Sequence, residues 1–229
     1  MKILGLIGGI SWVSTQDYYK YINEGINAQL GDVNFARLII HSMNYAEIKK
    51  NNDADNWDAN FNLIYPACEN MKAGGAQGIV LCANTMHLLA DRLEAKLQLP
   101  VIHIATATAN VIKRQQLKKV ALLGTKFTML RDFFTDKLKA QGIEAIVPEE
   151  ADREFIHYTI FEELGRGIIS AETKSRYIAI INQLMARGAE GVILGCTEIP
   201  LLIQPEDVTV PTFDTTKIHS DAAVAFALS

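Results

Sequence analysis

The sequence contains two similar stretches, GAQGIVLCANTMHLL at residues 75–89 and GAEGVILGCTEIPLL at residues 188–202. Aligned without a gap, they set Ala83 opposite Cys196 and Cys82 opposite Gly195. Each stretch has a Gly-Ala turn, an apolar run of strand length and small polar residues where the run ends. An apolar run bounded by turn residues is typical of a buried parallel strand. The two stretches therefore predict an α/β fold made of two related halves.

The rest of the chain alternates short apolar runs with segments of helical period, which is the pattern of parallel βα units. The expected strands are residues 3–7, 36–41, 78–82, 101–104, 120–123, 144–147, 192–194 and 208–213. The expected helices are residues 18–30, 57–72, 85–97, 128–140, 153–164, 171–187 and 215–228. We therefore expect two pseudo-symmetric Rossmann-like domains, each with a parallel sheet flanked by helices, and an active site in the cleft between them. The expected domains are residues 1–98 plus 213–229, and residues 99–212.

Composition excludes several classes of partner. The 22 lysines and arginines against 26 aspartates and glutamates give a net charge of −4 without a basic stripe, so no nucleic acid is expected as a partner. The three cysteines are odd in number and widely spaced, which predicts neither a disulfide framework nor a metal site. No apolar stretch approaches the roughly 20 residues that span a membrane. We expect a soluble cytoplasmic protein with no membrane contact.

The polar residues that follow the strands are the candidate site, because ligands of open parallel sheets bind beyond the carboxyl ends of the strands. Cys196 lies between a strand and a short helical turn, where backbone N–H groups favour a thiolate. It is the candidate base or nucleophile, and a small buried cysteine is the alternative. The substrate-binding candidates are Ser11, Asn84, Thr85, Thr125, Thr128, Thr197 and Glu198. Their alternative role is to stabilise the start of a helix.

Two more residues are auxiliary candidates. Cys82 precedes Ala83, so strand alternation directs it into the packing behind the strand when Ala83 faces the site. His87 lies on the first turn after Thr85, where it could assist a proton transfer or simply pack, and its counterpart in the second stretch is Pro200. Residues 5–9 lack the G-x-G-x-x-G spacing, so no nucleotide cofactor is expected.

The chain resembles the aspartate/glutamate racemase family over essentially its whole length. The motifs that carry the resemblance are residues 5–9, Cys82–His87, Gly124-Thr125, Gly195–Glu198 and residues 210–214. The opening GGISW and HSMNYAEI at residues 41–48 resemble the broad-specificity amino-acid racemase branch. The resemblance implies a homodimeric racemase without pyridoxal phosphate or another cofactor. It also implies two cysteines that flank Cα of a small amino-acid or dicarboxylate substrate, one removing a proton and the other supplying one.

The sequence departs from that pattern at the first cysteine. Cys196 matches the second cysteine, whereas the place of the first, directly before Asn-Thr, is Ala83. The basic residues of aspartate-specific members fall at Ile48 and near Gly165. We expect an amino-acid racemase that abstracts or returns the Cα proton through a single thiol. The alternatives are a single-thiol decarboxylase or isomerase of small dicarboxylates, and a catalytically impaired amino-acid-binding relative.

Overall fold

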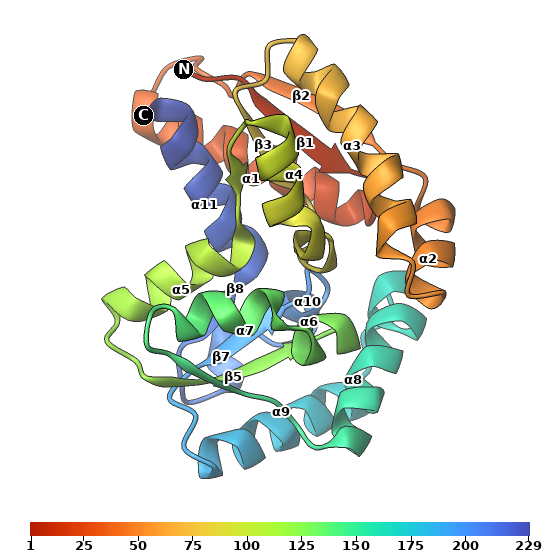
Figure 1. The fold of residues 1–229 in the computed structure, drawn as a ribbon. Helices are drawn as coiled ribbons and strands as arrows, with labels where there is room; N and C mark the ends of the chain where they lie inside the picture. The colour runs from red at the N-terminus through yellow and green to blue at the C-terminus, as the bar shows by residue number, and fades with distance from the viewer. The chain divides into compact units, whose positions relative to one another are not determined.

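A computed structural model describes residues 1–229, which divide into two compact units. Unit 1 comprises residues 1–103 and 219–229, and unit 2 comprises residues 104–218. The sequence alone predicts these boundaries at residues 98/99 and 212/213. Each unit has one four-stranded parallel sheet with helices on both faces, which confirms the expected α/β class with two parallel sheets (Figure 1).

The sheet of unit 1 has the strand order β2-β1-β3-β4. Its strands are β1 (Leu4–Gly8), β2 (Leu38–Ser42), β3 (Gly78–Leu81) and β4 (Val101–Ile102). Its helices are α1 (Trp12–Leu30), α2 (Tyr45–Asp53), α3 (Trp57–Ala73), the 3-10 helix η1 (Asn84–Leu89), α4 (Ala90–Leu97) and the C-terminal part of α11 (Thr215–Leu228). Because β3 lies inside the sheet beside β1, the turn after β3 leaves from the middle of the carboxyl edge.

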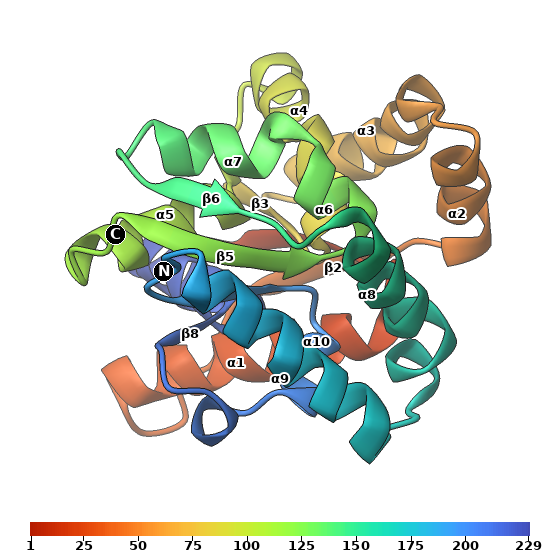
Figure 2. The same cartoon turned by 90° about the horizontal axis from the view of Figure 1, so that it is seen from below.

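The sheet of unit 2 has the equivalent order β6-β5-β7-β8 and is seen in Figure 2 with its covering helices. Its strands are β5 (Lys119–Gly124), β6 (Glu144–Ile146), β7 (Val192–Gly195) and β8 (Thr212–Asp214). Its helices are α5 (Ile104–Arg114), α6 (Lys126–Leu130), α7 (Asp132–Lys139), α8 (Glu150–Glu162), η2 (Leu164–Arg166), α9 (Ala171–Ala186), α10 (Ile199–Leu202), η3 (Pro205–Asp207) and the first turn of α11. The shared strand order shows that the sequence repeat is a repeat of structure.

Alternate residues of β3 pack into two different hydrophobic clusters, one on each face of its sheet. Ile79 and Leu81 pack with α3 and α4, and Ala83 lies against the same cluster. Val80 and Cys82 pack on the opposite face with α1 and α11. This alternation is the two-residue period of a strand carried one step past its end.

In β7 the same alternation places Val192, Leu194 and Cys196 with α8 and α9, and Ile193 with α5 and α7. Cys196 therefore has the same strand position and the same side of its sheet as Ala83 has in unit 1. The structure agrees with the alignment that set Ala83 opposite Cys196.

Several expected elements differ from the observed ones, and helices α2 and α5 are not among those expected from the sequence. The expected helix 128–140 is two helices, because Arg131 is extended (φ −96°, ψ 148°) between α6 and α7. The expected helix 85–97 begins as the 3-10 helix η1. The expected strand 208–213 shortens to β8, which begins directly after Pro211, a residue without an N–H group for the sheet. By contrast, α3 continues through Pro66.

Candidate functional site

The Cys196 turn brings a thiol, a hydroxyl and a carboxylate together at the carboxyl end of β7. The Cys196 Sγ donates to Glu198 Oε2 at 2.9 Å, and the Thr197 Oγ1 donates to the same oxygen at 2.8 Å. The Ile199 N–H donates to the Cys196 carbonyl at 3.2 Å and closes the turn. All three side chains are partly exposed. Glu198 Oε2 is thus the common acceptor of this group.

Partial burial raises the pKa of the Cys196 thiol well above its usual value, and the negative charge of Glu198 raises it further. Backbone N–H groups of Thr197 and Glu198 act in the opposite direction and do not prevail. Helix α10 has only four residues, so its N-terminus contributes little positive charge. The sequence-based expectation of a thiolate is therefore wrong for the resting protein. Cys196 rests as a thiol that holds its proton against a carboxylate.

Thr125 lies on the strand end beside that of Cys196, because Gly124 and Gly195 are paired neighbours in β5 and β7. Thr125 stabilises the first turn of α6, accepting from the Thr128 N–H at 3.4 Å. The two hydroxyls of Thr125 and Thr128 lie 3.3 Å apart. Thr128 is fully buried, and a Cβ at Gly124 would approach its side chain to 3.0 Å. The site candidates of unit 2 therefore gather at two adjacent strand ends.

The corresponding turn of unit 1 carries a methyl group at Ala83, whose backbone is extended (φ −155°, ψ 134°) before η1. Ser11 stabilises the start of α1, accepting from the Ser14 N–H at 3.2 Å. Ser14 Oγ in turn donates to the Cys82 carbonyl at 2.9 Å. Asn84 is buried and Thr85 is partly exposed at the start of η1. The N-terminus of α1 thus supports the strand end that leads into Ala83.

Cys82 itself is buried in the core between the sheet, α1 and α11. Its Sγ lies 3.9 Å from the Val80 carbonyl. Burial raises the pKa of its thiol, since no nearby positive charge compensates the loss of water. This thiol lies on the face of the sheet opposite Ala83.

His87 lies beneath the Ala83 turn and is 2% exposed. Its Nδ1 lies 3.1 Å from the Ala83 carbonyl and 3.2 Å from the Asn84 carbonyl. Burial lowers the pKa of His87 to about 4, although the neighbouring carbonyls offset part of that effect. His87 is therefore a neutral imidazole at neutral pH.

Two residues that the sequence analysis did not select complete a buried cluster with His87. His219 of α11 and His103 have ring centroids 5.1 and 5.0 Å from that of His87. The Tyr18 hydroxyl lies 2.7 Å from His219 Nδ1, and His219 Nε2 lies 2.5 Å from the Ile102 carbonyl. Tyr18 and His219 are 201 positions apart, so no local pattern could indicate the pair.

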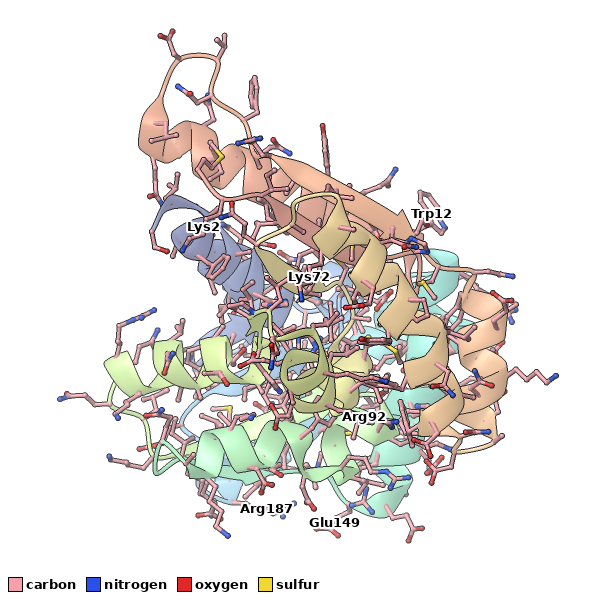
Figure 3. The ribbon with its side chains drawn as sticks, turned by 45° about the horizontal axis from the view of Figure 1, so that its top comes forward. Lys2, Trp12, Lys72, Arg92, Glu149 and Arg187 are labelled. Carbon is pink, nitrogen blue, oxygen red and sulfur yellow. The ribbon has the colours of Figure 1, made fainter.

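The two positions where the resemblance expects basic residues carry Ile48 and Gly165. Ile48 is fully buried in the core of unit 1. Arg166, next to Gly165, forms an ion pair with Glu162 at 2.5 Å on the surface of unit 2. Arg92 on α4, labelled in Figure 3, pairs with Asp58 of α3.

The start of α1 is also an exposed region. Trp12, its first residue, is 67% exposed and extends away from the ribbon in Figure 3. Gly9, two residues before Ser11, constrains this turn. Its φ is +80°, and a Cβ there would lie 2.3 Å from the Met43 carbonyl oxygen. Glycine is required at that position on both counts.

No helix of the protein is long and apolar enough to cross a membrane. No group of three or more His, Cys, Asp or Glu side chains has a metal-binding arrangement.

A family model described as Asp/Glu/Hydantoin racemase matches residues 7–223. A crystal structure from Yersinia pestis, of a protein provisionally named Asp/Glu racemase, is 46% identical with a TM-score of 0.95 and 100% of both chains covered. An aspartate racemase homologue from Pyrococcus horikoshii OT3 is 35% identical with a TM-score of 0.87, also with 100% of both chains covered. The broad specificity amino-acid racemase RacX of Bacillus subtilis is 20% identical, with 99% of both chains aligned. The chain spans about half the length of the curated glutamate racemases that it matches.

Proposed function

Because the chain belongs to the Asp/Glu/hydantoin racemase family, a family of isomerases, we propose that it is an amino-acid racemase that needs no cofactor and uses a single thiol, Cys196. Ala83 occupies the position of the other thiol. The observation that carries the proposal is the hydrogen bond of 2.9 Å from the Cys196 thiol to Glu198, at the strand end whose counterpart carries only a methyl group. The catalytic acid–base group is thus present once rather than twice.

The proposed reaction begins from the protonated thiol. Glu198 accepts the S–H proton, and the resulting thiolate removes the Cα proton of the bound amino acid. This leaves an S–H group on Cys196 and a carbanion delocalised into the substrate carboxylate. Return of a proton from Cys196 regenerates the starting enantiomer.

Inversion requires a proton on the opposite face of the carbanion, and a methyl group cannot supply it. Cys82 is a poor source because its thiol is buried on the other side of its sheet and its pKa is raised. We therefore assign this step to a water molecule, which protonates the carbanion and leaves hydroxide. The hydroxide takes the proton held by Glu198, which restores water and the carboxylate. One thiol thus serves one face of the substrate.

The polar residues of the same turns are assigned to substrate binding. In unit 2, Thr197 offers a hydroxyl group that shares the Glu198 acceptor with the thiol. Thr125 offers a hydroxyl at the adjacent strand end, where Thr128 supports it from the core. In unit 1, Ser11, Asn84 and Thr85 lie at the starts of α1 and η1. N–H and hydroxyl groups at helix starts suit the α-carboxylate of an amino acid.

The test is exchange of the Cα hydrogen for deuterium in heavy water, followed by proton NMR over a panel of L- and D-amino acids. We expect Cys196→Ala to lower the exchange rate by about 100-fold or more, the usual range for loss of an acid–base group. Thr159→Val, which removes a buried hydroxyl elsewhere in unit 2, is the control for a general loss of stability.

Three results would contradict the proposal. Exchange that survives in Cys196→Ala removes the thiol from the reaction. Turnover of malonate- or maleate-type dicarboxylates without amino-acid exchange selects the decarboxylase or isomerase alternative. Amino-acid binding without any exchange selects an impaired relative.

A further inference from the structure

The turn that carries Ala83 has a side-chain contact on its first carbonyl, in addition to the backbone bonds of η1. In unit 2 the Cys196 carbonyl accepts a hydrogen bond from the Ile199 N–H at 3.2 Å. In unit 1 the equivalent carbonyl, that of Ala83, lies 3.1 Å from Nδ1 of His87. The residue aligned with His87 is Pro200, which has neither an imidazole nor an N–H group. His87 therefore adds to the Ala83 carbonyl a side-chain donor that the aligned residue of unit 2 cannot supply.

The contacts of His87 fix its tautomer. A carbonyl oxygen only accepts, so Nδ1 carries the hydrogen and donates to the Ala83 and Asn84 carbonyls. Nε2 is buried and makes no hydrogen bond. Both hydrogen bonds that Nδ1 makes are thus directed at the turn, to the two residues joined by the Ala83–Asn84 peptide bond.

The surroundings of His87 keep its ring in place. The rings of His103 and His219 lie 5.0 and 5.1 Å away, tilted or edge-on to it. His219 is itself fixed, because its Nε2–H donates to the Ile102 carbonyl and its Nδ1 accepts from the Tyr18 hydroxyl. With α1, α11 and β4 all contributing, the donor beneath the turn is held by three elements distant in sequence.

Burial also excludes a direct role for His87 in proton transfer to substrate. The side chain is 2% exposed, and Nε2, the nitrogen that would take up a proton, makes no hydrogen bond. A proton relay needs a continuous chain of hydrogen bonds to the reacting atom. The two carbonyl contacts instead suit a group that sets the geometry of the backbone above it.

We propose that His87 is a positioning residue, whose Nδ1–H holds the Ala83 and Asn84 carbonyls so that Asn84 and Thr85 are presented to the substrate. The identity of the substrate in this assignment rests on the proposed function, whereas the contacts that hold the turn are independent of it. The role differs from both the proton transfer and the simple packing that the sequence left open for His87, and it accounts for a histidine at this position without a second base.

The test uses the matched pair His87→Asn and His87→Leu. Asparagine and leucine have the same branched shape, but only asparagine carries an amide N–H close to the position of Nδ1. A residue that merely fills the core is replaced at least as well by leucine as by asparagine. A residue that holds the turn is replaced only by asparagine.

The primary measurement is amide hydrogen–deuterium exchange of the peptide covering residues 83–89, by mass spectrometry on the full chain without substrate. Loss of the donor in His87→Leu is expected to speed exchange in this peptide about tenfold, the equivalent of one buried hydrogen bond. His87→Asn is expected to stay within about twofold of wild type. A peptide covering β5 of unit 2 should be unchanged in both variants. Should His87→Leu fail to fold, His87→Gln, whose longer side chain carries the amide toward Nε2, is compared with His87→Asn instead.

The secondary measurement is the KM and kcat of Cα hydrogen exchange. We expect His87→Leu to raise KM about tenfold with a smaller change in kcat, and His87→Asn to restore most of the difference. Wild-type-like amide exchange in His87→Leu, or equal loosening in His87→Asn and His87→Leu, overturns the positioning role. If the wild-type protein does not catalyse exchange of the substrate Cα hydrogen, the proposed function is overturned. The amide exchange still decides the positioning role of His87 by itself.

Discussion

Acid should destabilise this protein through the buried histidines of unit 1, and His87 allows the effect to be calculated. Its pKa is lowered from 6.5 in the unfolded chain to about 4 in the folded protein, because burial removes water from the ring. Between these two values the unfolded state binds a proton that the folded state does not. Stability therefore falls as pH is lowered from about 6.5 toward about 4, and the loss is complete below the folded value.

The linkage relation gives a loss of about 2 kcal/mol from His87 alone between pH 7 and pH 5. His219 adds to the loss in the same direction, since burial and the neighbouring His87 also lower its pKa. Two kcal/mol is a large part of the 5–15 kcal/mol of an ordinary domain, so the effect should be easily measured.

Urea unfolding at pH 7 and pH 5, on wild type and His87→Leu, measures the contribution directly. The variant lacks the titrating group, so its free energy of unfolding should fall by about 2 kcal/mol less than that of wild type over this interval. The comparison within each protein removes the difference in stability that the substitution itself causes at pH 7. An equal fall in both proteins would refute the view that His87 stays neutral in the fold.

Three further predictions concern the thiols and the core. At pH 7 iodoacetamide should leave Cys68 and Cys82 of the native protein unmodified, because both are buried with raised thiol pKa values; peptide mass spectrometry would detect the contrary. Glu198→Gln should speed alkylation of Cys196 several-fold, because the neighbouring carboxylate raises the pKa of the Cys196 thiol. An unchanged alkylation rate would show that Glu198 does not influence this thiol. Ile48→Lys introduces the basic residue of aspartate-specific relatives at a fully buried position. It should lower the free energy of unfolding by about 3 kcal/mol or more in urea titrations. An unchanged free energy of unfolding would place residue 48 at the surface.

The sequence was sufficient for the fold because the signals that specify parallel βα units are local. Apolar runs between turn residues identified the strands, and the repeat fixed the correspondence of Ala83 with Cys196, which the common faces of β3 and β7 reproduce. Helix bounds were less accurate where a local break decided them, as at Arg131 between α6 and α7. A single extended residue leaves no periodic trace in the sequence.

The electrostatics of the candidate site could not be read in the same way. A cysteine at the start of a helix suggested a thiolate, but the carboxylate of Glu198 and the burial of the thiol oppose it, and both depend on side-chain placement. The His87 environment depends on His219 and Tyr18, which the fold brings together from opposite ends of the chain. Local spacing carries no information about such contacts.

The most direct test of the central claim is the ratio of Cα hydrogen exchange rates for the two enantiomers of one substrate in heavy water, in wild type and in Ala83→Cys. With one thiol, exchange should be much faster for the enantiomer whose Cα hydrogen faces Cys196, and that enantiomer should exchange faster than it inverts. A second thiol at residue 83 should bring the two rates together and raise the rate of inversion. Equal rates for both enantiomers in wild type, or a ratio that Ala83→Cys leaves unchanged, would contradict the assignment of Cys196 as the single proton carrier.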